Sequence, residues 1–188
     1  MRQRYNTSAI VLGRTPLAEA SALIYLLTPE FGLVKARAQG VRKAGAKLSC
    51  AVQTLVESDV ILVKGKEGWR LGGALLCSSW FGALTTENRA RAGRVARFLL
   101  RMVHGETNDT QLFFILKSFL EVLTNANEVE ADSAEHIVVL RLLNELGLDA
   151  GSPLGSYEDY SSSVLAEIAR DKREYVMRIN RGISASGL

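Results

Sequence analysis

The amino-acid sequence predicts an α+β fold in which a small closed β-barrel is followed by an α-helical domain. Up to residue 80, short runs of β-branched and apolar residues alternate with turns that carry glycine or proline. After residue 80, the apolar residues recur with the spacing of amphipathic helices. We therefore expect two domains, residues 1–80 and residues 81–188, in a chain that is 47% hydrophobic.

Five strands are expected in the first domain. The candidate segments are TSAIVL, SALIYLLT, GLVKARAQ, QTLVESDVILVKG and GWRLGGALLC. No helical pattern separates them, and the segments between them carry the glycine and proline residues that turns require. Five short strands joined in this way are typical of an OB-fold barrel.

Four helices are expected in the second domain. The first covers residues 85–104 and carries arginines along one face. The second, QLFFILKSFLEVL, is capped by Asn108 or Asp109, and the third, EHIVVLRLLNELG, is capped by Ser133. A polar segment, DAGSPLGSYEDYSSS, then leads to a single fourth helix with an apolar stripe.

Positive charge is concentrated in the first domain. Residues 1–80 contain 11 Lys and Arg against 5 Asp and Glu, whereas the remaining residues contain 12 against 15. The stretch FGLVKARAQGVRKAGAKL has no acidic residue and five basic ones: Lys35, Arg37, Arg42, Lys43 and Lys47. Alternating polar residues ordinarily mark the solvated face of a strand. Charge this dense and uncompensated instead favours a bound polyanion.

A single-stranded nucleic acid is the natural polyanion for an OB barrel, because its phosphates can follow a positively charged groove. Base stacking would require exposed aromatic rings. The only aromatic residues before residue 80 are Tyr5, Tyr25, Phe31 and Trp69. We therefore expect contacts mainly to the phosphate backbone, with little dependence on base sequence.

The sequence contains no pattern typical of a catalytic, metal or cofactor site. No nucleophile is paired with a base, and the glycines form neither GxGxxG nor a P-loop. Cys50 and Cys77 are the only cysteines, so we expect two buried free thiols and no metal site. No apolar run reaches the roughly 18 residues of a membrane span, and no signal peptide is recognisable. We expect a cytoplasmic protein that is not an enzyme and needs no cofactor.

A resemblance to the RecO family of bacterial DNA repair proteins runs through AIVLGRTPLAEASALIYLLTPEFGLVKARAQGVRKAGAKLSCAVQ. The family has an early strand, a glutamate, a Thr-x-x-x-Gly turn and a Gly-x-Arg-Lys hairpin. The matching residues are Glu19, Thr28, Gly32, Gly40, Arg42 and Lys43. Residues 140–149, LRLLNELGLD, are similar to the leucine-rich helix ending in Leu-Gly that follows the barrel in this family.

The resemblance implies a nucleoid-associated protein that binds single- and double-stranded DNA and anneals complementary strands. It also implies assistance in loading the recombinase RecA onto strands coated by single-strand-binding protein, with RecR as a partner. No catalytic residue is needed, because duplex formation itself supplies the free energy of annealing.

The sequence departs from the family in two places. Many members carry a four-cysteine zinc module after the Leu-Gly helix, where this chain has DAGSPLGSYEDYSSS. We therefore expect no zinc and a shortened C-terminal part. The family also tends to have arginines at the start of that helix, where this chain has His136 and Ile137.

The resemblance further implies that the helical domain receives the acidic, apolar-ended tail of single-strand-binding protein. Such a tail needs an apolar pocket with a cationic rim. The candidate residues are Arg94, Arg97, Arg101, His136, Leu140 and Arg141. Ordinary surface pairing is the competing interpretation for the arginines, and core packing is the competing interpretation for the leucines.

A second class of function stays open at this point. An OB-fold adaptor would hold RNA or a protein partner and would have no annealing activity. Complementary labelled strands distinguish the two, because an adaptor leaves the rate of annealing unchanged.

Overall fold

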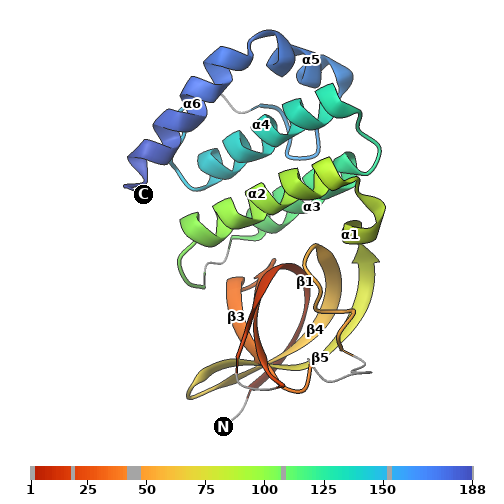
Figure 1. Ribbon diagram of the computed structural model, residues 1–188. Helices are drawn as coiled ribbons and strands as arrows, with labels where there is room; N and C mark the ends of the chain where they lie inside the picture. Colours follow the sequence, from red (N-terminus) through yellow and green to blue (C-terminus); the bar gives the residue numbers. More distant parts are fainter. Residues whose placement is uncertain (1–2, 18–19, 42–47, 107–108, 152–153, 188) are drawn as a thin grey trace. The chain divides into compact units, whose positions relative to one another are not determined.

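The computed structural model describes residues 3–17, 20–41, 48–106, 109–151 and 154–187 (Figure 1). The chain forms two compact units. The first contains the residues up to Ala83 together with Ala96–Phe113, and the second contains Leu84–Val95 together with the residues from Phe114 onward. The predicted domain boundary at residue 80 stays a prediction.

Five strands form a closed barrel in the first unit (Figure 1). They are β1 (Gln3–Pro16), β2 (Ala22–Thr28), β3 (Gly32–Ala38), β4 (Val56–Gly65) and β5 (Gly68–Ser79). Their order around the barrel is β1-β2-β3-β5-β4, and all pairs are antiparallel except β3 with β5. The predicted α+β fold, an OB barrel followed by helices, is confirmed.

The barrel core is built from alternate residues of each strand. In β3, Val34, Ala36 and Ala38 are buried, whereas Lys35 and Arg37 are exposed. This is the alternation that the sequence predicts, and it follows from the two-residue period of a strand. Strand β1 begins before the predicted TSAIVL segment because Gln3–Asn6 pair with the end of β4.

The turn between β2 and β3 explains the Thr-x-x-x-Gly pattern. The hydroxyl of Thr28 is buried, accepts a hydrogen bond from the Phe31 N–H and donates one to the Gly32 carbonyl, both at 3.1 Å. Gly32 has φ +59°, a conformation that favours a residue without Cβ. The two residues thus set the turn that starts β3.

The helices lie C-terminal to the barrel strands. They are α1 (Trp80–Ala83), α2 (Thr86–Met102), α3 (Thr110–Leu123), α4 (Glu128–Glu145), α5 (Ser162–Arg170) and α6 (Lys172–Ala185). Within the second unit, α4 packs against both α5 and α6 (Figure 1). None of the helices in the described ranges is both long enough and apolar enough to span a membrane.

Three local predictions are wrong. Helix α4 is capped by Asn127 and not by Ser133, which is buried inside the helix because α4 starts earlier than expected. The single fourth helix is two helices, because the backbone at Asp171 leaves the helical region with φ −106° and ψ 25°. Cys50 and Cys77 are exposed, not buried.

The cap of α4 gives a test of this fold. The Asn127 side chain accepts from the Glu130 N–H and the Glu130 carboxylate accepts from the Asn127 N–H, both at 3.0 Å, which forms a capping box. We expect Asn127→Ala to lower the free energy of unfolding by about 1 kcal/mol, measured by urea denaturation. Asn127→Asp keeps an acceptor and serves as the control. An Asn127→Ala variant with an unchanged free energy of unfolding would contradict the role of Asn127 as the cap of α4.

Candidate nucleic-acid interface

The register of the barrel brings arginines of different strands together. In the parallel pair of β3 and β5, Arg37 lies opposite Arg70. Arg70 is also opposite Val63 of β4, and Val63 is opposite Arg4 of β1. Opposite residues in a sheet share a face. We call the exposed cations Arg4, Arg37 and Arg70 the arginine row.

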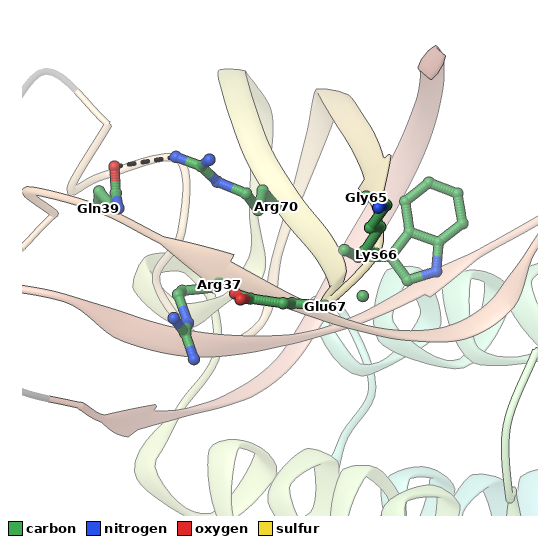
Figure 2. A pocket seen from close by; sticks show the side chains of 8 residues that line it. Arg37, Gln39, Gly65, Lys66, Glu67 and Arg70 are labelled. Atoms are coloured by element: carbon green, nitrogen blue, oxygen red, sulfur yellow. Dashed lines mark hydrogen bonds between the residues drawn. The ribbon is translucent and has the colours of Figure 1, made fainter. Parts of the chain in front are cut away.

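An open notch lies beside the arginine row, between β3 and the β4–β5 hairpin. It has a volume of about 480 Å³ and is lined by Arg37, Gln39, Gly65, Lys66, Glu67, Gly68, Trp69 and Arg70. The Arg70 Nη2 donates to the Gln39 Oε1 at 3.1 Å, a bond drawn in Figure 2. The described lining has three cationic side chains against one carboxylate, so it favours an anion. OB-folds commonly bind oligonucleotides at this end of the sheet, beside the loop between strands 4 and 5.

Three aromatic rings of the barrel pack against one another. Tyr5, Phe31 and Trp69 meet with centroid separations of 5.0, 5.5 and 5.3 Å, and Trp69 is only 7% exposed. Tyr25 is half-buried and lies opposite Lys35, whose Nζ is 5.9 Å from the ring centroid. The described surface therefore offers charge to a phosphate backbone and little ring area to bases.

The carboxylate of Glu106, which lies outside the barrel strands, accepts hydrogen bonds from both Lys64 and Trp69. Glu106 accepts from Lys64 Nζ at 2.7 Å and from Trp69 Nε1 at 2.8 Å, and its backbone forms a bridge with Gly32. The pKa of Glu106 is lowered, mainly by the hydrogen bond from Lys64 and to a smaller extent by the one from Trp69. Burial acts in the opposite direction and is outweighed. Lys64 is therefore paired, which distinguishes it from the cations of the arginine row.

The structure describes only part of the predicted DNA-binding set. Lys35 and Arg37 are on the outer face of β3 as expected. Arg42, Lys43 and Lys47 lie outside the described residues. Sequence reasoning missed Arg4, Lys66 and Arg70, because their proximity to β3 follows from strand pairing. The local signal for Arg70 was its position next to the inward Trp69 in β5.

The predicted partner-binding arginines of α2 have different environments. Arg94 donates to Glu135 with Nε and Nη2 at 2.6 and 2.7 Å, and this pairing raises the pKa of Arg94. The surface-pairing interpretation thus describes Arg94, although the acid belongs to α4. Arg97 and Arg101 are exposed. Their role in binding a partner stays a prediction.

The predicted partner-binding residues of α4 are mostly enclosed. Leu140 is 1% exposed and Arg141 is 7% exposed. Arg141 donates to three main-chain carbonyls, with Nη1 to Tyr157 at 2.9 Å and Nη2 to Leu154 and Asp159, each at 2.7 Å. Desolvation lowers the pKa of this guanidinium. Arg141 thus holds the loop before α5, which places it in the helical core and not at a cationic rim.

His136 is partly buried on the same helix. Its Nδ1 lies 2.7 Å from the main-chain carbonyl of Asp132, which can only accept, so Nδ1 carries the proton. Among the described residues, no group of three or more His, Cys, Asp or Glu is placed to hold a metal ion.

Comparisons with known proteins point to one family. Residues 1–78 match the family described as recombination protein O N terminal. A DNA repair protein RecO of Trichodesmium erythraeum is 30% identical over 122 residues, covering 64% of this chain and 42% of that protein. One from Dehalococcoides mccartyi strain BAV1 is 31% identical over 130 residues, covering 67% and 50%. The chain thus spans about half the length of these curated relatives or less.

The Glu106 contact gives a pH-dependent test. A glutamate whose pKa is lower in the folded chain stabilises the fold above its unfolded pKa of about 4.3. The contribution is lost as the pH falls through the folded pKa. We expect Glu106→Gln to lower Tm at pH 7, and the difference in Tm from wild type to disappear below pH ~4.

Because the Glu106 side chain is 44% exposed, the effect of Glu106→Gln on the free energy of unfolding should not exceed about 1 kcal/mol. Glu67→Gln, an exposed hairpin residue with the same charge change, is the control. A Tm difference between Glu106→Gln and wild type that persists at low pH would contradict the role of the Lys64–Glu106 ion pair.

Proposed function

We propose a DNA-binding and strand-annealing function for this chain, which belongs to the RecO family of DNA repair proteins. The observation that carries the proposal is the pairing of Arg37 with Arg70 on the outer face of the barrel, beside the cationic notch. Like charges opposite one another in a sheet destabilise it. A bound phosphate backbone offsets that repulsion.

The surface chemistry suits annealing. Cations that contact phosphates neutralise the repulsion between two strands. Phosphate contacts also leave the base edges free to pair, and the described barrel surface offers little ring area on which bases would stack. The same contacts are available to double-stranded DNA. No catalytic group is required, because pairing of the bases supplies the free energy.

The proposed role in recombination extends to protein partners. We propose that the chain acts with RecR and assists loading of RecA onto strands coated by single-strand-binding protein. The acidic tail of single-strand-binding protein requires exposed cations. Arg94 is exposed but hydrogen-bonded to Glu135, so Arg97 and Arg101 on α2, which are also exposed, are the candidates.

The DNA surface is tested by removing the arginine pair. If about five phosphates are neutralised, log affinity for a single strand should fall with log salt with a slope of roughly −3.5. Arg37→Ala/Arg70→Ala should make this slope shallower by about 1.4 and slow annealing. Arg173→Ala/Arg181→Ala removes two exposed arginines of α6 and is the matched control.

Fluorescence anisotropy over a salt series measures the slope, and labelled complementary strands measure the annealing rate. A folded Arg37→Ala/Arg70→Ala protein with an unchanged slope would exclude this face as the DNA surface. Binding of RNA with no acceleration of annealing by the wild type would favour the adaptor function instead.

The tail surface is tested separately. We expect Arg97→Glu/Arg101→Glu to weaken binding of a labelled peptide with acidic residues and an apolar end by at least about threefold. Arg173→Glu/Arg181→Glu is the control with the same charge change. Equal affinities in the two variants would show that the tail binds elsewhere or not at all.

A further inference from the structure

Part of strand β5, the yellow strand that leads to α1 in Figure 1, is paired on one side only. Towards β4, Gly73–Leu76 pair without interruption with Ser58–Ile61. Towards β3, the pairs of β5 among the described residues are those of Trp69 and Arg70. In the described part of the chain, the main-chain groups of Gly73–Leu76 that point away from β4 therefore have no partner strand. We call Gly73–Leu76 the open edge.

The open edge is apolar on both of its faces. Leu75 is 69% exposed and Leu76 is 38% exposed, and consecutive residues of a strand point to opposite faces. None of the residues from Arg70 to Ser79 is buried. Single apolar side chains on a surface are ordinary. Exposed leucines on both faces of a strand that also has a free edge are instead typical of a strand beside which another strand can add.

A groove beside the open edge favours a cation. It crosses the outer face of the barrel, has a volume of about 610 Å³ and is lined by Asn6, Thr7, Ser8, Asp59, Val60, Ile61, Ala74 and Leu75. Asp59 lies opposite Leu75, and its Oδ1 accepts from the Ser8 hydroxyl at 2.9 Å. Among the described residues, no lysine or arginine lines the groove or forms an ion pair with Asp59. A side chain with an apolar stem and a cationic end, such as lysine, suits this combination of leucine and carboxylate.

A second copy of this chain is a poor occupant of the open edge. Pairing of two open edges would join only a short stretch of each copy, whereas a stable interface needs roughly 20–30 residues a side. It would also bring the exposed Asp59 carboxylates of two copies towards one another. An extended peptide does not need a large area, because an added strand gains affinity from main-chain hydrogen bonds.

We propose that the open edge accepts an extended segment of a partner protein as an added β-strand. The main chain of Gly73–Leu76 forms hydrogen bonds with the segment. On the outer face, a cationic side chain of the segment lies along Leu75 and reaches Asp59, and on the other face an apolar side chain covers Leu76. This surface does not use the arginine row, so its occupation and the binding of DNA are independent of one another.

The proposal is tested with a dye-labelled peptide of eight residues that alternates lysine and valine, with valine favouring an extended strand. Fluorescence anisotropy with the full chain should show saturable binding. Two further peptides carry methyl groups on alternate main-chain nitrogens, one on the odd positions and one on the even positions. Only one of them should bind, because alternate N–H groups of a strand point to opposite sides. Failure of the unmodified peptide to bind, or equal binding of the two methylated peptides, would overturn the proposal.

Variants of the leucine assign the binding to the open edge. Leu75→Thr keeps a residue that suits a strand but removes apolar contact, and it should weaken binding of the peptide by about threefold or more. Val129→Thr is the matched control, since Val129 of α4 is 65% exposed. It should change the affinity by less than about twofold. Equal effects of the two variants would contradict the assignment to β5.

Variants of the carboxylate test the cationic contact. Asp59→Asn keeps an acceptor for Ser8 and should weaken binding of the lysine-valine peptide by about threefold. It should not affect a peptide with threonine in place of lysine. Glu67→Gln makes the same charge change on the β4–β5 hairpin and should leave both affinities unchanged. An Asp59→Asn effect no larger than that of Glu67→Gln would show that the peptide does not reach the groove.

Cys77 provides a second measurement of the position of the peptide. Its thiol is exposed and lies 3.6 Å from the Leu75 carbonyl, so an added strand should cover it. Saturating peptide should slow alkylation of Cys77, followed by mass spectrometry, by at least about threefold. The methylated peptide that does not bind should leave the rate unchanged. Equal rates with and without the unmodified peptide would place its binding elsewhere.

Light scattering over a range of protein concentrations tests the alternative occupant. The wild type should stay monomeric. A dimer that Leu75→Thr dissociates would show that the open edge pairs with a second copy, and it would overturn the proposed partner segment.

Discussion

Closure of the barrel through the parallel pairing of β3 with β5 is the constraint on which the candidate DNA surface depends. This pairing fixes which residues of distant strands become neighbours, and it sets Arg37 beside Arg70. The β1–β4 pairing then extends the row to Arg4. Because alternate residues must fill the interior, the cations have no position except the outer face. Packing of the core and charge on the surface are thus consequences of one topology.

The two compact units carry opposite chemistry. The barrel presents cations to the outside while its rings Tyr5, Phe31 and Trp69 pack together at the core. The second unit contains a groove whose described lining includes Glu121, Glu130 and Glu158 and no lysine or arginine. The uneven charge along the sequence, basic before residue 80 and acidic after it, already indicated partners of different kinds.

Local pattern was sufficient for the strands and for the outward position of Lys35 and Arg37, because a two-residue period is visible in the sequence itself. The contributions of Arg4 and Arg70 were not predictable in this way, since strand register is a long-range property. The cap of α4 had a local signal, Asn127 followed three residues later by Glu130, but Ser133 competed with it. Arg141 resembled a surface cation because its carbonyl partners lie up to 18 residues away in the chain.

The anchoring of the loop before α5 by Arg141 has a consequence for how that segment can change. The guanidinium donates hydrogen bonds to the main-chain carbonyls of Leu154, Tyr157 and Asp159, and it also lies over the ring of Tyr160. Every residue type offers the same carbonyl, so exchange of the side chains at these positions would not by itself remove the hydrogen bonds donated by Arg141. A planar group with several N–H donors is needed to reach all three, which a lysine cannot replace. Arg141 therefore holds the segment through the path of its backbone and not through the identity of the side chains at Leu154, Tyr157 and Asp159.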